Sequence, residues 1–285
     1  MRFVHQESTE QAAANRSALP HEASFAGHRQ RLTELIAEVT PAGTGQRLCV
    51  LGAGNGYDLE LPSLAERFDE IHLVDLDADA LAGARLRADA VTRARLFCHA
   101  PVDLSGLLED LPRWAELRLT PQDLMDHPRR TAQHLVHVLG SRPFDTVVSA
   151  CMLSQMQLSV LRGLGERHQL FEAVRYTLNL SHMRTLLELT APGGRALFVT
   201  DVSSEQLTAL PPSLADADAL ELLSASSRAG RVFDFAEPHA LRAQFLQDPS
   251  LVALGRISKP GAAWIWQNGP AQRFLVYALE LTRVA

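Results

Sequence analysis

Residues 50–58 read Val-Leu-Gly-Ala-Gly-Asn-Gly-Tyr-Asp, with glycine at the three alternate positions 52, 54 and 56. An apolar run at 47–51 leads into the glycines and indicates a buried strand, and a helical pattern follows from residue 58. Glycine has no Cβ, so such a chain can turn tightly and bring its backbone close to a ligand. The stretch therefore predicts a ligand-binding turn between a strand and a helix, with a purely structural turn as the alternative.

Short apolar runs alternate with helical segments on both sides of this turn. The predicted strands are 47–51, 70–75, 96–98, 144–149 and 195–200, and the predicted helices are 28–39, 58–68, 78–91 and 168–189. Strict alternation requires parallel strands joined by crossover helices. We therefore expect an α/β fold with a doubly wound, mostly parallel sheet.

The remaining segments indicate how the chain is organised. The runs 263–266 and 273–279 flank a turn-rich stretch and predict a C-terminal hairpin. Residues 1–25 show little periodicity, so we expect a loose arm, with 1–40 forming an arm and lid helix. Residues 41–285 then form one domain, with an insertion at about 104–142 that holds one or two extra helices.

The second predicted strand ends at Asp75, where a carboxylate can accept both ribose hydroxyls of an adenosine ligand. The same position also suits a helix N-cap. A dinucleotide fingerprint would need glycine at position 57, which is Tyr57 here, and Asp58 places negative charge where a pyrophosphate would bind. A ligand with cationic groups suits this turn better than a dianion.

Four segments in this order resemble motifs of the class I S-adenosylmethionine (SAM)-dependent methyltransferases. They are 50–56, 74–85, 144–149 and 192–198, and the resemblance covers roughly residues 28–280. It implies a Rossmann-like, seven-stranded sheet whose last strand is antiparallel, in agreement with the predicted hairpin.

The resemblance also implies SAM as the cofactor and a set of residues that bind it. The family often has an acidic residue two positions before the first glycine, but this chain has Val50, so Asp58 or main-chain carbonyls must take the cofactor's amino group. Asp103 or His99 is the candidate for the adenine amine, and His28 or Arg29 for the methionine carboxylate. The expected cofactor contacts are Arg29, Gly52, Ala53, Gly54, Asn55, Gly56, Asp58, Asp75, Leu76, Asp103, Ser149, Ala150 and Cys151.

An acceptor should bind beyond the carboxyl ends of the parallel strands. Gln155 follows the fourth strand, and Trp266 should emerge on the same side as an aromatic wall, although it also suits closure of the sheet edge. The first turns of the helix 168–189 reach this side as well. We expect His28, Gln155, Arg175 and Trp266 to bind the substrate, and Tyr176 and His168 to be catalytic.

The composition narrows the class of protein. The net charge of −6 gives no electrostatic footprint for nucleic acid, and no run approaches the ~20 apolar residues that span a bilayer. Three dispersed cysteines and the histidines at 127, 134 and 137 complete no metal-ligand spacing. We therefore expect a cytoplasmic protein with no nucleic-acid or membrane partner and no metal.

These observations predict a SAM-dependent methyltransferase that transfers a methyl group to oxygen or nitrogen of a small molecule. The alternatives are a peptide or protein acceptor, a dinucleotide-dependent oxidoreductase, and a catalytically silent SAM-fold binding protein. The oligomeric state stays open.

Overall fold

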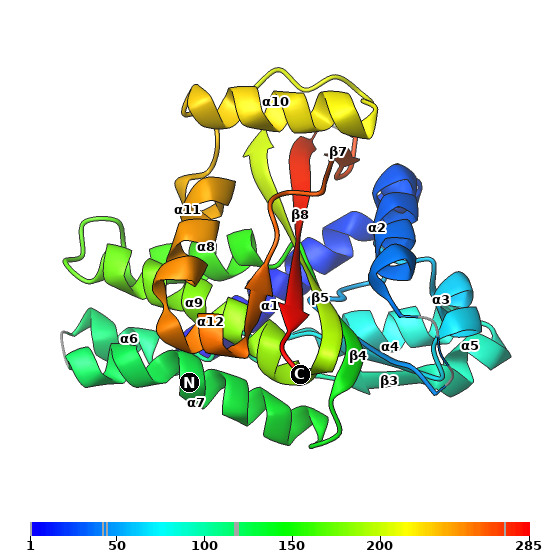
Figure 1. Cartoon of the computed structure of the whole chain (residues 1–285), viewed down its shortest axis with the longest axis horizontal. Helices are drawn as coiled ribbons and strands as arrows, with labels where there is room; N and C mark the ends of the chain where they lie inside the picture. Colours follow the sequence, from blue (N-terminus) through cyan, green and yellow to red (C-terminus); the bar gives the residue numbers. More distant parts are fainter. Residues whose placement is uncertain (1, 42, 44, 117–119, 271) are drawn as a thin grey trace.

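One mixed sheet of eight strands forms within residues 2–41, 43, 45–116, 120–270 and 272–285, which the computed structural model describes (Figure 1). Residue 1 of the predicted arm and residues 117–119 of the predicted insertion lie outside the described residues. The strands are β1 (Arg47–Leu51), β2 (Glu70–Val74), β3 (Leu96–His99), β4 (Phe144–Ala150), β5 (Thr190–Ser204), β6 (Gly255–Ile257), β7 (Ala262–Gln267) and β8 (Arg273–Arg283).

The order of the strands is β3-β2-β1-β4-β5-β8, with β6 and β7 on the outer edge of β8. The first five strands pair in parallel, and β8 is antiparallel to β5. The predicted doubly wound sheet with an antiparallel C-terminal hairpin is confirmed. The strand expected at 263–266 is β7, and the short strand β6 was not predicted, so the sheet has eight strands rather than seven.

Helices cover both faces of this sheet. They are α1 (Arg2–Ala18), η1 (Leu19–Phe25), α2 (Ala26–Val39), α3 (Leu61–Arg67), α4 (Ala78–Arg87), α5 (Ala90–Arg95), α6 (Leu111–Ala115), α7 (Pro121–Leu139), α8 (Leu153–Leu164), α9 (Phe171–Leu189), α10 (Asp216–Arg228), η2 (Asp234–Ala236), α11 (Pro238–Gln247) and α12 (Pro249–Leu254).

Side chains of β1 show how the strands divide the core. Leu48 and Val50 pack with α2 and α3 on one face, whereas Cys49 and Leu51 pack with α7, α8 and α9 on the other. Successive side chains of a strand point to opposite faces, so an uninterrupted apolar run serves two cores at once. All five residues of β1 are buried, which fixes the glycine turn that follows it at the middle of the sheet.

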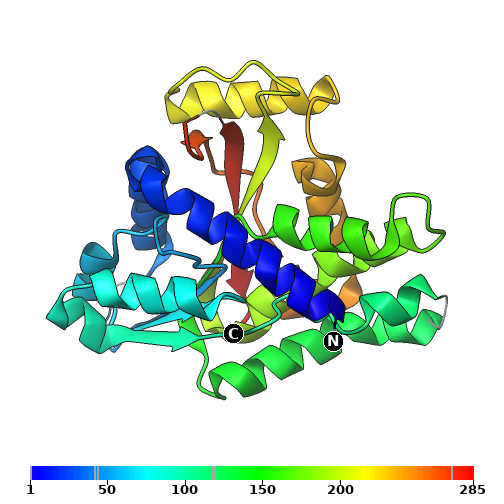
Figure 2. The same ribbon diagram turned by 180° about the vertical axis from the view of Figure 1, so that it is seen from behind.

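The N-terminus departs from the expected loose arm. Residues 2–18 form α1, which crosses the centre of the molecule in front of the strand ends (Figure 2). Its buried side chain is Glu7, and Gln11 and Asn15 on the same face are partly buried. Apolar periodicity misses this helix because its inner face is polar.

Three further boundaries differ from the predicted ones. The helix expected at 58–68 is α3 and starts only at Leu61, and the helix expected at 78–91 is divided into α4 and α5. The helix expected from His168 starts at Phe171, and α8, which was not predicted, precedes it. In the part of residues 104–142 that the structure describes, the helices are α6 and α7. Among the helices described, none combines the length and apolarity that a membrane crossing needs.

Candidate functional site

The glycine turn is held in backbone conformations that favour glycine. Gly52, Gly54 and Gly56 have φ values of +78°, +47° and +71°. A Cβ on Gly52 would overlap the side chain of Met152, and one on Gly54 would lie 3.1 Å from Asn15 Oδ1 in α1. The turn is therefore confined between the segment after β4 and the N-terminal helix.

Asp75, directly after β2, binds this turn. Its Oδ2 accepts the Gly54 amide over 2.8 Å, its Oδ1 accepts the Asp77 amide over 2.9 Å, and burial raises the pKa of the carboxyl group. The N-cap of α4 is Asp77, which accepts the amides of Asp79 and Ala80. Asp75 is thus available as a polar wall of the site rather than as a helix cap.

Two adjoining cavities lie beside this carboxylate. Cavity A extends from Asp75 past Leu76 and Asp103 toward Arg162, and cavity B extends from Asp75 along the glycine turn to Asp58 and Trp266. Both are lined by Gln11, Ala14, Asp75 and Gln155, so they form one continuous site.

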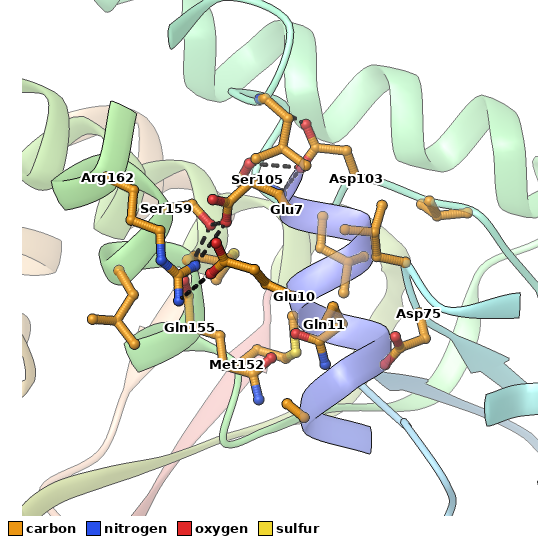
Figure 3. A pocket seen from close by; sticks show the side chains of 17 residues that line it. Glu7, Glu10, Gln11, Asp75, Asp103, Ser105, Met152, Gln155, Ser159 and Arg162 are labelled. Atoms are coloured by element: carbon orange, nitrogen blue, oxygen red, sulfur yellow. Dashed lines mark hydrogen bonds and ion pairs between the residues drawn. The ribbon is translucent and has the colours of Figure 1, made fainter. Parts of the chain in front are cut away.

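Helix α1 covers this continuous site and is fixed at both ends. In cavity A, Glu7 accepts hydrogen bonds from Ser159 and Arg162, and Arg162 also pairs with Glu10 at 2.8 Å (Figure 3). At the other end, Asn15 donates to Asp77, and its carbonyl accepts from the side chain of Asn55 over 2.7 Å. Figure 3 shows α1 between Arg162 and Asp75, with Gln11 over the cavity.

Two carboxylates lie near Cys151, at the end of β4: Asp201 is buried and Asp58 is partly exposed. Burial raises the pKa of Asp58 to about 7, although the nearby Arg29 lowers it, and burial raises that of Asp201 to about 6. Asp201 accepts a hydrogen bond from Ser154 over 2.9 Å. Burial raises the pKa of the Cys151 thiol, and the charges of Asp201 and Asp58 raise it further. This region favours a positive or hydrogen-bond-donating ligand group.

The structure brings together most of the residues that the sequence suggested. Those that line the two cavities are Gly52, Gly54, Asn55, Asp58, Asp75, Leu76, Asp103, Ala150, Cys151, Gln155 and Trp266. Ala53 and Gly56 shape the turn, and Ser149 is buried against His182 at 2.6 Å. Asp103 accepts from the amides of Ser105 and Leu108, and His99 pairs with His72.

Three expected substrate or catalytic residues lie elsewhere, because α8 stands between the end of β4 and the start of α9. Tyr176 is 41% exposed on α9, and His168 accepts the Leu170 amide at the beginning of that helix. Arg175 pairs with Asp234 at 2.6 Å and donates to Gln157. None of the three lines either cavity.

The two candidates on α2 are also engaged within the protein. Arg29 donates to Glu60 over 2.6 Å and to the Tyr57 carbonyl over 3.1 Å, which holds the chain just past the glycine turn. The ring of His28 is buried between Trp264 and Asp58. Neither side chain lines cavity A or B.

Several residues that line or close the site were not predicted from the sequence. These are Glu7, Gln11, Asn15 and Arg162. Those on α1 lie on its polar inner face, so an apolar stripe could not reveal them. Arg162 lies on α8, whose apolar residues Leu153, Met156 and Val160 are buried in the core. A polar stripe at helical spacing, with Glu7, Gln11 and Asn15 each four residues apart, was the available signal. Within the described residues, no group of three or more His, Cys, Asp or Glu side chains is placed to hold a metal ion.

No family model and no curated protein sequence matches this chain, but solved structures do. TrmN from Thermus thermophilus is 15% identical with a TM-score of 0.42, over 89% of this chain and 48% of TrmN, so the chain spans about half of that protein. An rRNA methylase from Streptococcus thermophilus is 11% identical with a TM-score of 0.41, over 90% of this chain and 95% of that one. Magnesium protoporphyrin IX methyltransferase from Synechocystis PCC 6803, with bound SAH, is 13% identical with a TM-score of 0.42, over 90% and 84%.

The fold is the Rossmann-like one of class I methyltransferases, and the strand order with antiparallel β8 carries this assignment. The expectation that excluded nucleic acid as a partner is wrong. TrmN and an rRNA methylase are among the similar structures.

Proposed function

We propose that this protein is a SAM-dependent methyltransferase that methylates oxygen or nitrogen of a small molecule. The observation that carries the proposal is the shared wall of the two cavities, where the glycine turn and the Asp75 carboxylate meet under α1. The turn offers backbone without Cβ atoms, and the carboxylate offers acceptors for the two hydroxyls of a ribose. This pairing fits a nucleoside ligand.

In this proposal the cofactor extends through both cavities. Asp75 holds the ribose, Leu76 and Asp103 border the adenine in cavity A, and the amino-acid end lies along the turn toward Asp58 in cavity B. SAM supplies an electrophilic methyl group on a sulfonium. The chain's own contribution is to orient this group, since an in-line displacement depends chiefly on proximity and alignment.

The acceptor is proposed to bind in cavity B near Gln155 and Trp266. The Trp266 ring packs edge-on against Phe25, with ring centroids 5.8 Å apart, and both rings line this cavity. An aromatic wall of this kind suits a planar or cationic acceptor. Tyr176 and His168 lie outside the cavities, so no proton transfer through them is part of this proposal.

Calorimetry with S-adenosylhomocysteine on the folded full-length chain tests the cofactor assignment. A dissociation constant in the micromolar range or tighter, about −8 kcal/mol, is expected. A folded protein that gives no heat and no thermal shift with this nucleoside contradicts the proposal. An increase in NADH fluorescence on mixing would instead favour an oxidoreductase.

Activity is tested separately from binding. The chain is incubated with methyl-labelled SAM and with pools of small molecules, peptides or RNA, and incorporated label is measured in each pool. Label in the small-molecule pool is expected. Label in the peptide or RNA pool alone would overturn the acceptor class, and cofactor binding without turnover in any pool would indicate a silent SAM-fold binding protein.

A further inference from the structure

The buried side chains of Trp264 and His28 and the partly exposed carboxylate of Asp58 form a chain that ends at cavity B. Trp264 on β7 donates from Nε1 to His28 Nδ1 over 3.0 Å, and His28 Nε2 lies 3.5 Å from Asp58 Oδ1. Within the described residues, that Asp58 oxygen and that His28 nitrogen have no hydrogen-bond partner. The Asp58 carboxylate lines cavity B, whereas His28 lies behind it.

The tryptophan determines which nitrogen of the histidine carries the proton. An indole N–H can only donate, so His28 Nδ1 must be the acceptor. Burial lowers the pKa of His28 to about 3, so the ring is neutral at physiological pH. Its single proton is therefore on Nε2, and this N–H faces Asp58.

The neighbours of Asp58 leave its charge uncompensated on the side of the cavity. Arg29 acts on it electrostatically but binds Glu60 and the Tyr57 carbonyl. The other ionisable groups that line cavity B are Tyr57, Asp75 and the Cys151 thiol, and the charge of Asp201 acts on that thiol. No Arg, Lys or His side chain is among the residues that line this cavity.

We propose that Asp58 binds the primary ammonium group at the amino-acid end of the cofactor, with His28 and Trp264 as the residues that orient its carboxylate. The inference rests on the proposed function. It also accounts for the absence of an acidic residue two positions before the first glycine. That position is Val50, a buried apolar residue of β1.

Binding of the ammonium group at Asp58 should depend on pH. Burial raises the pKa of Asp58 to about 7, so part of the free protein carries a protonated Asp58 at neutral pH. An ammonium ligand requires the ionised carboxylate, so binding near pH 6.5 must release a proton. His28 stays neutral across this range because its pKa is far lower.

The test compares two nucleosides on the full-length protein by calorimetry at pH 6 and pH 8. S-Adenosylhomocysteine carries the amino-acid group, and 5′-methylthioadenosine lacks it. The wild type should prefer S-adenosylhomocysteine at least tenfold at pH 8 and less at pH 6. Asp58→Asn should abolish this preference at both pH values and leave 5′-methylthioadenosine affinity unchanged, and His28→Gln should reduce it.

Asp79→Asn, an exposed carboxylate in the first turn of α4, is the matched control and should retain the wild-type preference. Proton release by the wild type, measured in two buffers of different ionisation enthalpy at pH 6.5, requires no variant to fold. Equal affinity of the wild type for both nucleosides, or an unchanged preference in folded Asp58→Asn, overturns the inference. If folded wild type binds neither nucleoside, the proposed function itself fails.

Discussion

Asn15 in α1 donates from Nδ2 to Asp77 Oδ2 over 2.9 Å, and so joins the N-terminal helix to the cap of α4. The two residues are separated by 62 positions in the sequence, and Asp75 lies two residues before the acceptor. A helix fixed to this loop must move, or at least loosen, when a nucleoside enters beneath it. We therefore expect α1 to act as a lid, and such lids exclude water from the reacting groups.

Arg162→Ala should release the N-terminal end of this lid. The substitution removes the ion pairs to Glu7 and Glu10 and leaves Glu7, which is 5% exposed, with Ser159 alone. Hydrogen exchange of residues 2–18 should become faster while exchange in β1 and β4 stays slow, and protease sensitivity of α1 should rise. Arg16→Ala, an exposed position on the same helix, is the control. The lid prediction fails if exchange in α1 is unchanged, or if removal of residues 1–18 leaves turnover and cofactor affinity intact.

Asp75→Ala should weaken S-adenosylhomocysteine binding at least tenfold. A charge-assisted hydrogen bond is worth roughly 1.5–3 kcal/mol, and this carboxylate also holds the Gly54 amide. Calorimetry gives the affinity, and circular dichroism checks that the variant remains folded. Asp89→Ala is a useful comparison, because it removes a helix cap on α5 away from either cavity. Unchanged affinity in a folded Asp75→Ala protein would place the ribose elsewhere.

Arg29→Lys should act mainly on stability. Arginine holds Glu60 and the Tyr57 carbonyl with different nitrogens of one planar group, which a lysine ammonium cannot reproduce. We expect a loss of about 1 kcal/mol in the free energy of unfolding, measured in urea, with cofactor affinity changed less than threefold. A selective loss of affinity at unchanged stability would show instead that the guanidinium binds a ligand carboxylate. Glu60→Gln should reproduce the stability loss.

His182 should make the protein less stable in acid. It is buried on α9 against Ser149, and burial lowers its pKa from 6.5 to about 4. Between these values the unfolded chain binds more protons than the folded one, so this group's contribution is fully present above pH 6.5 and is lost as the pH falls toward 4.

His182→Gln should therefore show a smaller fall in unfolding free energy between pH 7 and pH 4.5 than the wild type does. Asp58 and Asp201 act in the opposite direction in this range, because burial raises their pKa values. The measured quantity is consequently the difference between variant and wild type in the fall of the unfolding free energy from pH 7 to pH 4.5. Exposed His239→Gln should behave as the wild type, and an identical pH dependence of all three proteins would contradict the prediction.

The alternation of strands and helices, the glycine turn and the C-terminal hairpin were predictable because each has a local signature. The strands β1, β2 and β4 are rich in apolar residues, and the glycines at 52, 54 and 56 lie directly after the first of them. Helix α1 was not predictable in this way, because its inner face carries polar residues such as Glu7 and packs on a polar cavity rather than on an apolar core. Helix α8 does have an apolar inner face, with Leu153, Met156 and Val160 in the core, and the sequence prediction missed it.

The sequence by itself determined the type of fold and the place of the ligand turn, since backbone conformation at glycines and burial of strands are local properties of the chain. Only the tertiary structure decided which charged and polar groups face the ligand. His28 and Arg29 are neighbours in the sequence, and Asp58 follows the last glycine of the turn by two positions. In the structure, however, Arg29 binds Glu60, Asp58 lines cavity B, and His28 lies behind Asp58. The reason is physical: a side chain's partners, its burial and hence its pKa depend on residues such as Trp264, more than 200 positions away in the sequence.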